Sequence, residues 1–132
     1  MAKYCFPAIF TPEEEGGYSV RFPDIEGCFT CGDTLHEAVT MAEDALPLML
    51  ICMEDDKKAI PSPTRPQDVK HGAEEFVSLI AADTVSYRKK TSNMAVKKTL
   101  TIPQWLNTAA EEANVNFSQT LQEALAAKLG LQ

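Results

Sequence analysis

Apolar and polar residues alternate along three short segments near the start of the chain. In the first, YCFPAIFTP, every second residue from Tyr4 to Phe10 is apolar and lies on one face. YSVRF and CFTC follow, separated by the turn-forming segments EEEGG and PDIEG. The pattern predicts three antiparallel strands joined by tight turns. Pro7 has no N–H to donate to a neighbouring strand, which favours a sheet edge or a bulge for the first strand.

A helical spacing of apolar residues follows in DTLHEAVTMAEDALPLMLICM. Thr34 and Glu37 have the spacing of a capping box, which predicts a helix that begins after Thr34. Its apolar stripe would pack on the sheet, and it consists of Leu35, Ala38, Val39, Ala42, Leu46, Met49, Leu50 and Met53. Pro47 lies inside this helix and removes one helical hydrogen bond, so we expect a kink or a break there.

The rest of the chain separates into a fourth strand, a linker and a second module. PSPTRPQ is rich in proline and predicts an extended loop, and FVSLIAA, residues 76–82, predicts a strand that returns to the same sheet. TVSYRKKTSNM, residues 84–94, is polar and basic without periodicity, which is typical of a linker. We therefore expect a first domain over residues 1–83 and a second over residues 95–132.

The second module begins with the alternating segment VKKTLTI and continues with two helical stripes. Pro103 suits the first position of the first helix, whose apolar face would bury Trp105 and Leu106. Asn116 is suited to cap the second helix, and Gly130 to end it. One strand and two amphipathic helices, about 36 residues, cannot bury their apolar faces alone. We therefore expect a homodimer, or a tetramer of two such dimers, in which the strands of two copies pair antiparallel.

A two-stranded ribbon of this kind fits the major groove of DNA. Strand alternation places Lys97, Thr99 and Thr101 on one face and Lys98 on the other. The first face would read base edges, with lysine contacting guanine acceptors and threonine contacting donors or the thymine methyl group. The backbone N–H groups at the start of the second helix would bind a phosphate, and these residues are Asn116, Phe117 and Ser118.

Composition and charge limit the function classes further. Of 132 residues, 45% are hydrophobic and 23% are charged, as in soluble globular proteins. Neither an apolar run of membrane-spanning length nor a signal-peptide pattern occurs, so we expect a cytoplasmic protein without a membrane partner. Residues 1–56 contain twelve acidic and two basic residues, whereas residues 57–98 contain nine basic and four acidic ones. The acidic part suits a basic protein partner and the basic part suits a polyanion, although a solvated surface explains either pattern.

The cysteines give weak evidence for metal or redox chemistry. Cys28 and Cys31 form a C-x-x-C pair, which occurs in zinc and redox sites. The sequence has no second ligand pair, and a strand over residues 28–31 would direct the two thiols to opposite faces. We therefore expect ordinary buried or half-buried thiols, and no bound metal or cofactor.

Carboxylates and histidines give equally weak evidence for catalysis. Asp24, Glu26 and Asp33 could contribute to a metal-dependent nuclease site, which needs several converging carboxylates. A turn explains Asp24, and the start of a helix explains Asp33. His36 and His71 have no nucleophile at a recognisable spacing, so we expect no enzyme.

Two segments resemble known families. KKTLTIPQWLNTAAEEANVNFSQTLQEAL resembles the ribbon-helix-helix module of bacterial regulators, and YCFPAIFTPEEEGGYSVRFPDIEGCFTCGDTLHEAV resembles the N-terminal domain of the HicB antitoxin family. Together the resemblances cover residues 3–60 and 95–131. They imply an α+β chain, in which a partial RNase H-like β-β-β-α-β domain precedes a ribbon-helix-helix (strand-helix-helix) module for dimerisation and DNA binding. In that family the first domain binds HicA, a small basic toxin that cleaves mRNA, and the second represses the operon that encodes both proteins.

The resemblance also implies a toxin-binding surface on the first domain. Its candidate residues are all acidic: Glu13, Glu14, Glu15, Asp24 and Glu26. A solvated turn explains the acidic run of residues 13–15 as well. An alternative function is a stand-alone ribbon-helix-helix repressor whose first domain senses a small molecule, although the sequence has neither a glycine-rich phosphate loop nor a polar cluster at ligand spacing.

Overall fold

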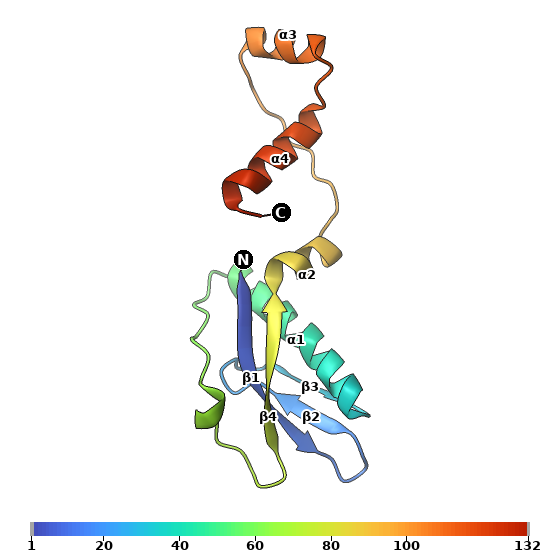
Figure 1. Cartoon of the computed structure of the whole chain (residues 1–132), viewed down its shortest axis with the longest axis vertical. Helices are drawn as coiled ribbons and strands as arrows, with labels where there is room; N and C mark the ends of the chain where they lie inside the picture. Colours follow the sequence, from blue (N-terminus) through green and yellow to red (C-terminus); the bar gives the residue numbers. More distant parts are fainter. Residues whose placement is uncertain (1, 132) are drawn as a thin grey trace. The chain divides into compact units, whose positions relative to one another are not determined.

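One long helix packs across a four-stranded antiparallel sheet in the first part of the chain. The computed structural model describes residues 2–131 and divides the chain into two units, residues 1–94 and residues 95–132. The first unit contains β1 (Lys3–Pro12), β2 (Tyr18–Arg21), β3 (Phe29–Gly32), α1 (Leu35–Asp55), the short 3-10 helix η1 (Pro66–Asp68), β4 (Phe76–Asp83) and α2 (Thr84–Thr91) (Figure 1). The predicted order of three strands, a helix and a fourth strand is confirmed, and with it the α+β class.

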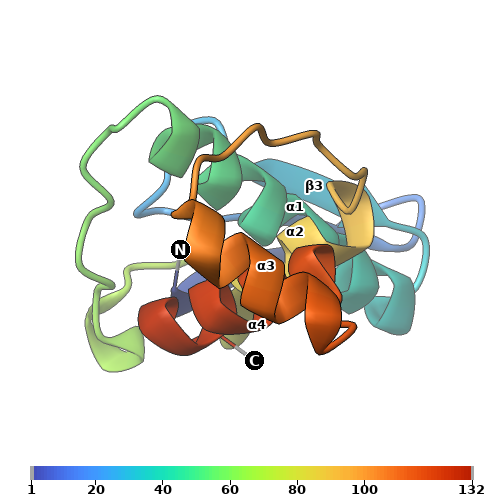
Figure 2. The same cartoon turned by 90° about the horizontal axis from the view of Figure 1, so that it is seen from above.

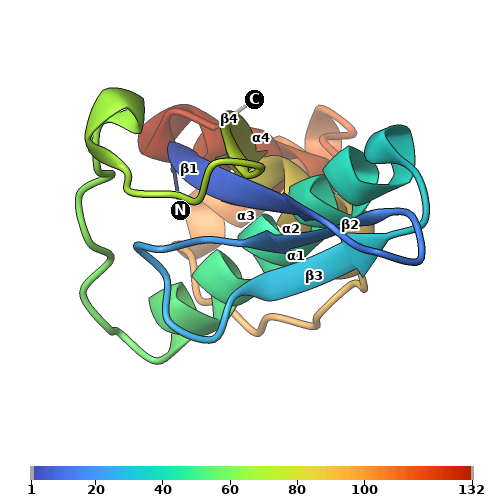
Figure 3. The same ribbon diagram turned by 90° about the horizontal axis from the view of Figure 1, so that it is seen from below.

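The sheet has the order β3-β2-β1-β4 (Figure 3). β1 therefore has a neighbouring strand on each side in the sheet order, but not along its whole length. β2 pairs only with residues 9–12 of β1, whereas β4 pairs with residues 3–10. Pro7 lies in the part of β1 that has β4 alone as a neighbour, which is the edge position that the sequence favours, and its missing N–H interrupts no pairing with β2.

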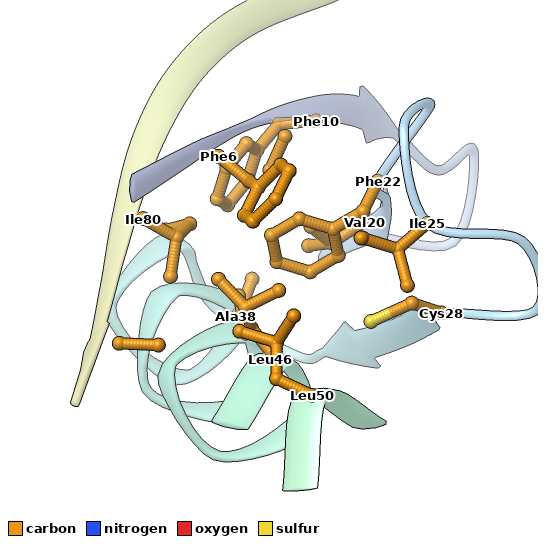
Figure 4. Packing of buried hydrophobic residues seen from close by; sticks show 13 residues of the cluster. Phe6, Phe10, Val20, Phe22, Ile25, Cys28, Ala38, Leu46, Leu50 and Ile80 are labelled. Atoms are coloured by element: carbon orange, nitrogen blue, oxygen red, sulfur yellow. The ribbon is translucent and has the colours of Figure 1, made fainter. Parts of the chain in front are cut away.

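The core lies between the sheet and α1. Phe6, Ala8 and Phe10 on one face of β1 are fully buried, as their alternation predicts. They meet apolar residues of α1, β2, β4 and the turn after β2, labelled among others in Figure 4: Val20, Phe22, Ile25, Ala38, Leu46, Leu50 and Ile80. Burial of a large side chain such as Phe6 or Leu46 stabilises the fold by about 1.5–3 kcal/mol.

α1 begins where the sequence predicts and continues through its proline. The Oγ1 atom of Thr34 accepts a hydrogen bond from the N–H of Glu37 at 3.1 Å, which confirms the predicted cap. The helix is not broken at Pro47, whose side chain is buried. An interior proline costs about 3 kcal/mol, and the burial of Leu46 and Leu50 beside it offsets that cost. Leu35 is exposed, unlike the inner members of the predicted stripe.

α2 lies within the segment that the sequence predicts to be a linker, so that prediction is wrong for residues 84–91. The carboxylate of Asp83 caps the helix and accepts from the N–H groups of Val85 and Ser86. Thr84 is fully buried, and α2 packs against α1 (Figure 2). This helix is stabilised by its cap and by polar contacts and not by an apolar stripe, so its sequence shows no apolar periodicity.

The second unit contains α3 (Gln104–Glu112) and α4 (Phe117–Leu129). The side chain of Asn116 accepts from the N–H of Gln119 at 3.1 Å, and Gly130 ends α4 with a φ of +69°, as predicted. Pro103 is the residue before the first turn of α3, one position earlier than expected. Within residues 2–131 the segment 96–102 has no strand partner, so the predicted strand does not form inside one chain and its pairing stays a prediction.

Candidate interaction surfaces

The second unit exposes its apolar residues in the single chain. Neither α3 nor α4 contains a buried residue. Trp105 is 71% exposed and Leu125 is 49% exposed, so the predicted packing of Trp105 in a helix core does not occur within one copy. Both helices are nevertheless regular. Apolar helix faces of this kind are stable in water only when another surface covers them.

The residues expected to read DNA lie on the surface of this unit. Lys97, Thr99 and Thr101 are exposed, and so is Lys98 on the expected opposite face. Since all four are accessible, the single chain does not distinguish the two faces. Only strand pairing fixes which side chains point into a groove.

The start of α4 offers backbone donors. Asn116 uses its side chain to cap the helix, and the hydroxyl of Ser118 accepts from Gln122 at 3.1 Å. In the described part of the chain the N–H groups of Phe117 and Ser118 have no protein acceptor. A helix N-terminus with two such N–H groups suits a phosphate oxygen.

The acidic run of residues 13–15 forms the tip of the turn between β1 and β2. The N–H of Glu13 donates to the carbonyl of Gly17, and the N–H of Gly16 donates to the carbonyl of Glu13, both at 3.0 Å. Gly16 and Gly17 have φ values of +95° and +81°, which other residues rarely adopt. This geometry holds the three exposed glutamates at a fixed place beside the sheet.

Asp24 and Glu26 have different environments. Asp24 accepts from both the N–H and the hydroxyl of Thr64, at 2.9 and 2.5 Å, and so ties its turn to the loop after α1. Glu26 is exposed in the turn after β2, whereas residues 13–15 lie in the turn before β2. The structure therefore gives Asp24 an anchoring role that sequence reasoning missed, because its partner lies forty positions away in the chain.

The other candidate chemistry is not assembled in the described residues. Cys28 is buried, which raises the pKa of its thiol to about 11, whereas Cys31 is exposed. Residues 2–131 contain no group of three or more histidines, cysteines or carboxylates able to hold a metal ion. His36 and His71 are exposed. In the same range, no helix has both the length and the apolar character that crossing a membrane requires.

Sequence reasoning also missed a polar cluster that joins α2 to α1 and β1. Arg88 donates to Glu54 at 3.1 Å and to Asp55 at 2.8 Å. The hydroxyls of Tyr4 and Thr84 donate to the other oxygen of Glu54, at 2.9 and 3.0 Å. Burial alone raises the pKa of Glu54, but hydrogen bonds from groups that include these three residues outweigh it and lower the pKa to about 2.

This cluster predicts a loss of stability in acid. The pKa of Glu54 is lower in the folded chain than its usual value of 4.5, so its stabilisation is present above about pH 4.5 and is lost as the pH falls towards 2. We expect urea unfolding of Glu54→Gln to depend less on pH in this range than unfolding of the wild type. Glu26→Gln serves as the control, since this exposed carboxylate makes no such bonds within residues 2–131. An identical pH dependence for Glu54→Gln and the wild type would contradict the assignment.

Comparisons with known proteins agree in matching this chain to bacterial antitoxins. A family model described as "HicB_like antitoxin of bacterial toxin-antitoxin system" matches residues 6–126. Antitoxin HicB 1 of Photorhabdus laumondii is 47% identical over 58 residues, which cover 44% of this chain and 37% of that protein. Antitoxin HicB 2 of the same bacterium is 31% identical over 123 residues, covering 91% of this chain and 87% of that protein.

A solved structure extends the similarity to the fold. The toxin–antitoxin complex from Streptococcus pneumoniae contains a chain that is 28% identical and superposes with a TM-score of 0.60. The match covers 96% of the present chain and 99% of that chain, so it includes both units. The match to HicB 1, in contrast, spans well under half of that relative's length.

Proposed function

The chain belongs to the HicB-like antitoxin family of bacterial toxin–antitoxin systems, and we propose that it neutralises an mRNA-cleaving toxin of the HicA type and represses the operon that encodes the pair. The observation that carries this proposal is the family match over residues 6–126, which includes parts of both units. Members of this family are regulatory proteins, so the chain is an antitoxin and not an enzyme. Inhibition of such a toxin's RNA cleavage by the purified chain tests the proposal.

We assign toxin binding to the first unit because of its charge. A protein that binds RNA presents a cationic surface, and residues 1–56 carry twelve acidic and only two basic residues. The exposed glutamates of the β1–β2 turn and Glu26 are the proposed contacts. Asp24 is also a candidate contact from the sequence, but its bonds to Thr64 support a role in fixing the adjacent turn instead.

We assign operator binding to the second unit, as a ribbon-helix-helix dimer. Two copies of residues 96–102 would pair as the antiparallel ribbon, with Lys97, Thr99 and Thr101 facing the bases. The exposed apolar faces of α3 and α4 would then be buried between the copies. Both proposed targets, mRNA-cleaving toxin and operator DNA, lie in the bacterial cytosol, which is where we propose that the protein acts.

The dimer has a direct test in α4. We expect Leu125→Glu to weaken association at least about a hundredfold, because two copies each lose about 1.5–3 kcal/mol of leucine burial and gain a buried charge. Gln119→Glu introduces the same charge at an exposed position of the same helix that points away from the side of Leu125, and it should leave association unchanged. Sedimentation equilibrium of the full chain measures both. A folded, monomeric wild type at micromolar concentration would contradict the proposal.

A further inference from the structure

Basic residues gather immediately before the second unit of this acidic chain. Five of its 12 lysines and arginines lie within residues 88–98, and they are Arg88, Lys89, Lys90, Lys97 and Lys98. The proposed ribbon includes only Lys97 and Lys98. Lys89 and Lys90 belong to the last turn of α2, in the first unit, and both are exposed.

The contacts of α2 fix the position of these two lysines on the first unit. Arg88 pairs with Glu54 and Asp55, and the hydroxyl of Tyr87 donates to Asp44 at 3.2 Å. Arg88 thereby compensates acidic groups at the end of α1 that would otherwise repel a polyanion. The last turn of α2 presents positive charge on a helix that is anchored by its cap and by these side chains.

The chain connection limits how far these lysines lie from a bound ribbon. Seven residues lead from Lys90 to Lys97, and an extended segment of seven residues spans at most about 25 Å. Successive base pairs of DNA are about 3.4 Å apart along the helix axis. When Lys97 occupies the major groove, Lys90 therefore lies within about 25 Å of it, a distance that equals the length of about seven base pairs, so phosphates that flank the ribbon are within its reach.

We propose that Lys89 and Lys90 make a second contact with DNA, to the phosphates that flank the segment bound by the ribbon. The inference rests on the proposed DNA binding of the second unit and adds a contact from the first unit. The expected ligand is the phosphate backbone, because an ammonium group is a flexible point charge and a phosphate contact carries no base specificity. The contact would strengthen binding to any sequence equally.

The salt dependence of binding to a duplex of mixed sequence, about 30 base pairs long, tests the proposal by fluorescence anisotropy with the full chain. We expect Lys89→Ala/Lys90→Ala to reduce the slope of log K against log salt by about 0.9 for each phosphate that is no longer bound, or about 2–4 for a dimer. Lys89→Arg/Lys90→Arg retains the charge and should retain the slope. Lys70→Ala removes an exposed lysine elsewhere on the first unit, in the loop before β4, and should leave the slope unchanged.

A change in salt slope distinguishes a phosphate contact from a purely structural role of the two lysines. Lysines in the last turn also stabilise a helix through its dipole, but removal of that effect lowers thermal stability and leaves the salt slope unchanged. An unchanged slope in the double variant, or an equal decrease in Lys70→Ala, overturns the proposal. If the wild type binds no DNA at low salt, both this contact and the operator binding of the second unit fail. If the wild type binds DNA and the slope decreases in Lys97→Ala/Lys98→Ala but not in Lys89→Ala/Lys90→Ala, the proposed contact by Lys89 and Lys90 is wrong, while DNA binding by the second unit stands.

Discussion

Replacing Lys97 by alanine is expected to abolish the preference of the protein for its operator, whereas replacing Lys98 is expected to preserve it. In the proposed ribbon Lys97 points into the major groove and donates to guanine, a contact that discriminates against a wrong base by about 1–3 kcal/mol. A dimer contains the contact twice, so the loss amounts to about 2–6 kcal/mol, or about 30-fold to 10⁴-fold in affinity. Lys98 faces away by strand alternation and contributes at most a phosphate contact.

Gel shifts on Lys97→Ala and Lys98→Ala at two salt concentrations separate these roles. Lys98→Ala should weaken binding to operator and to unrelated DNA by the same factor. The cause is the loss of a phosphate contact, which also reduces the dependence of the affinity on salt. Both variants should keep the wild-type circular dichroism and the ability to inhibit the toxin, since residues 97 and 98 are exposed. A shift of one residue in the strand register exchanges the two faces of the strand. Loss of specificity in Lys98→Ala and its retention in Lys97→Ala would contradict the assigned face.

The first unit without the second is expected to neutralise the toxin. Its sheet and α1 form a complete core, and all of the proposed toxin contacts lie within residues 1–56. The fragment has to end at Met94 and not at residue 83, the boundary that the sequence predicts. Removing α2 takes Thr84 and Arg88 away from Glu54, which leaves a largely buried carboxylate without two of its donors.

The local features of this fold are predictable from sequence because they depend on neighbouring residues. The cap by Thr34, the cap by Asn116 and the end of α4 at Gly130 follow from side chains within three or four positions of the helix ends. The alternation in β1 likewise predicts the buried face of Phe6, Ala8 and Phe10.

Features that depend on distant partners are not predictable in this way. α2 has no apolar periodicity, and its stability comes from residues thirty or more positions away, such as Glu54 for Arg88. The place of β1 in the strand order is another such feature, because it depends on which strands pair with β1 and over which residues. Asp24 has a typical turn sequence around it, which gives no indication of its bonds to Thr64.

In the candidate interaction surfaces, too, local features are predictable from the sequence and features that depend on distant partners are not. The exposure of Lys97, Thr99 and Thr101 and of the acidic turn follows from their polar character. The apolar stripe of α4 is also visible in the sequence, but the exposure of Leu125 is not, because it depends on whether one copy or two supply the covering surface. A pattern of apolar residues predicts that a face is buried, and does not specify by what.

Titration of an HicA-type toxin with fragments of the chain tests the central claim most directly. Cleavage of an RNA substrate is measured while residues 1–94 or residues 95–132 are added to the toxin. We expect residues 1–94 to stop cleavage once in slight molar excess, and residues 95–132 to have no effect. In the 1–94 fragment, reversal of Glu13, Glu14 and Glu15 to lysine should slow association about tenfold or more at low salt, because the acidic turn attracts the cationic toxin. Undiminished cleavage in the presence of residues 1–94, or inhibition by residues 95–132, would contradict the assignment of toxin neutralisation to the first unit.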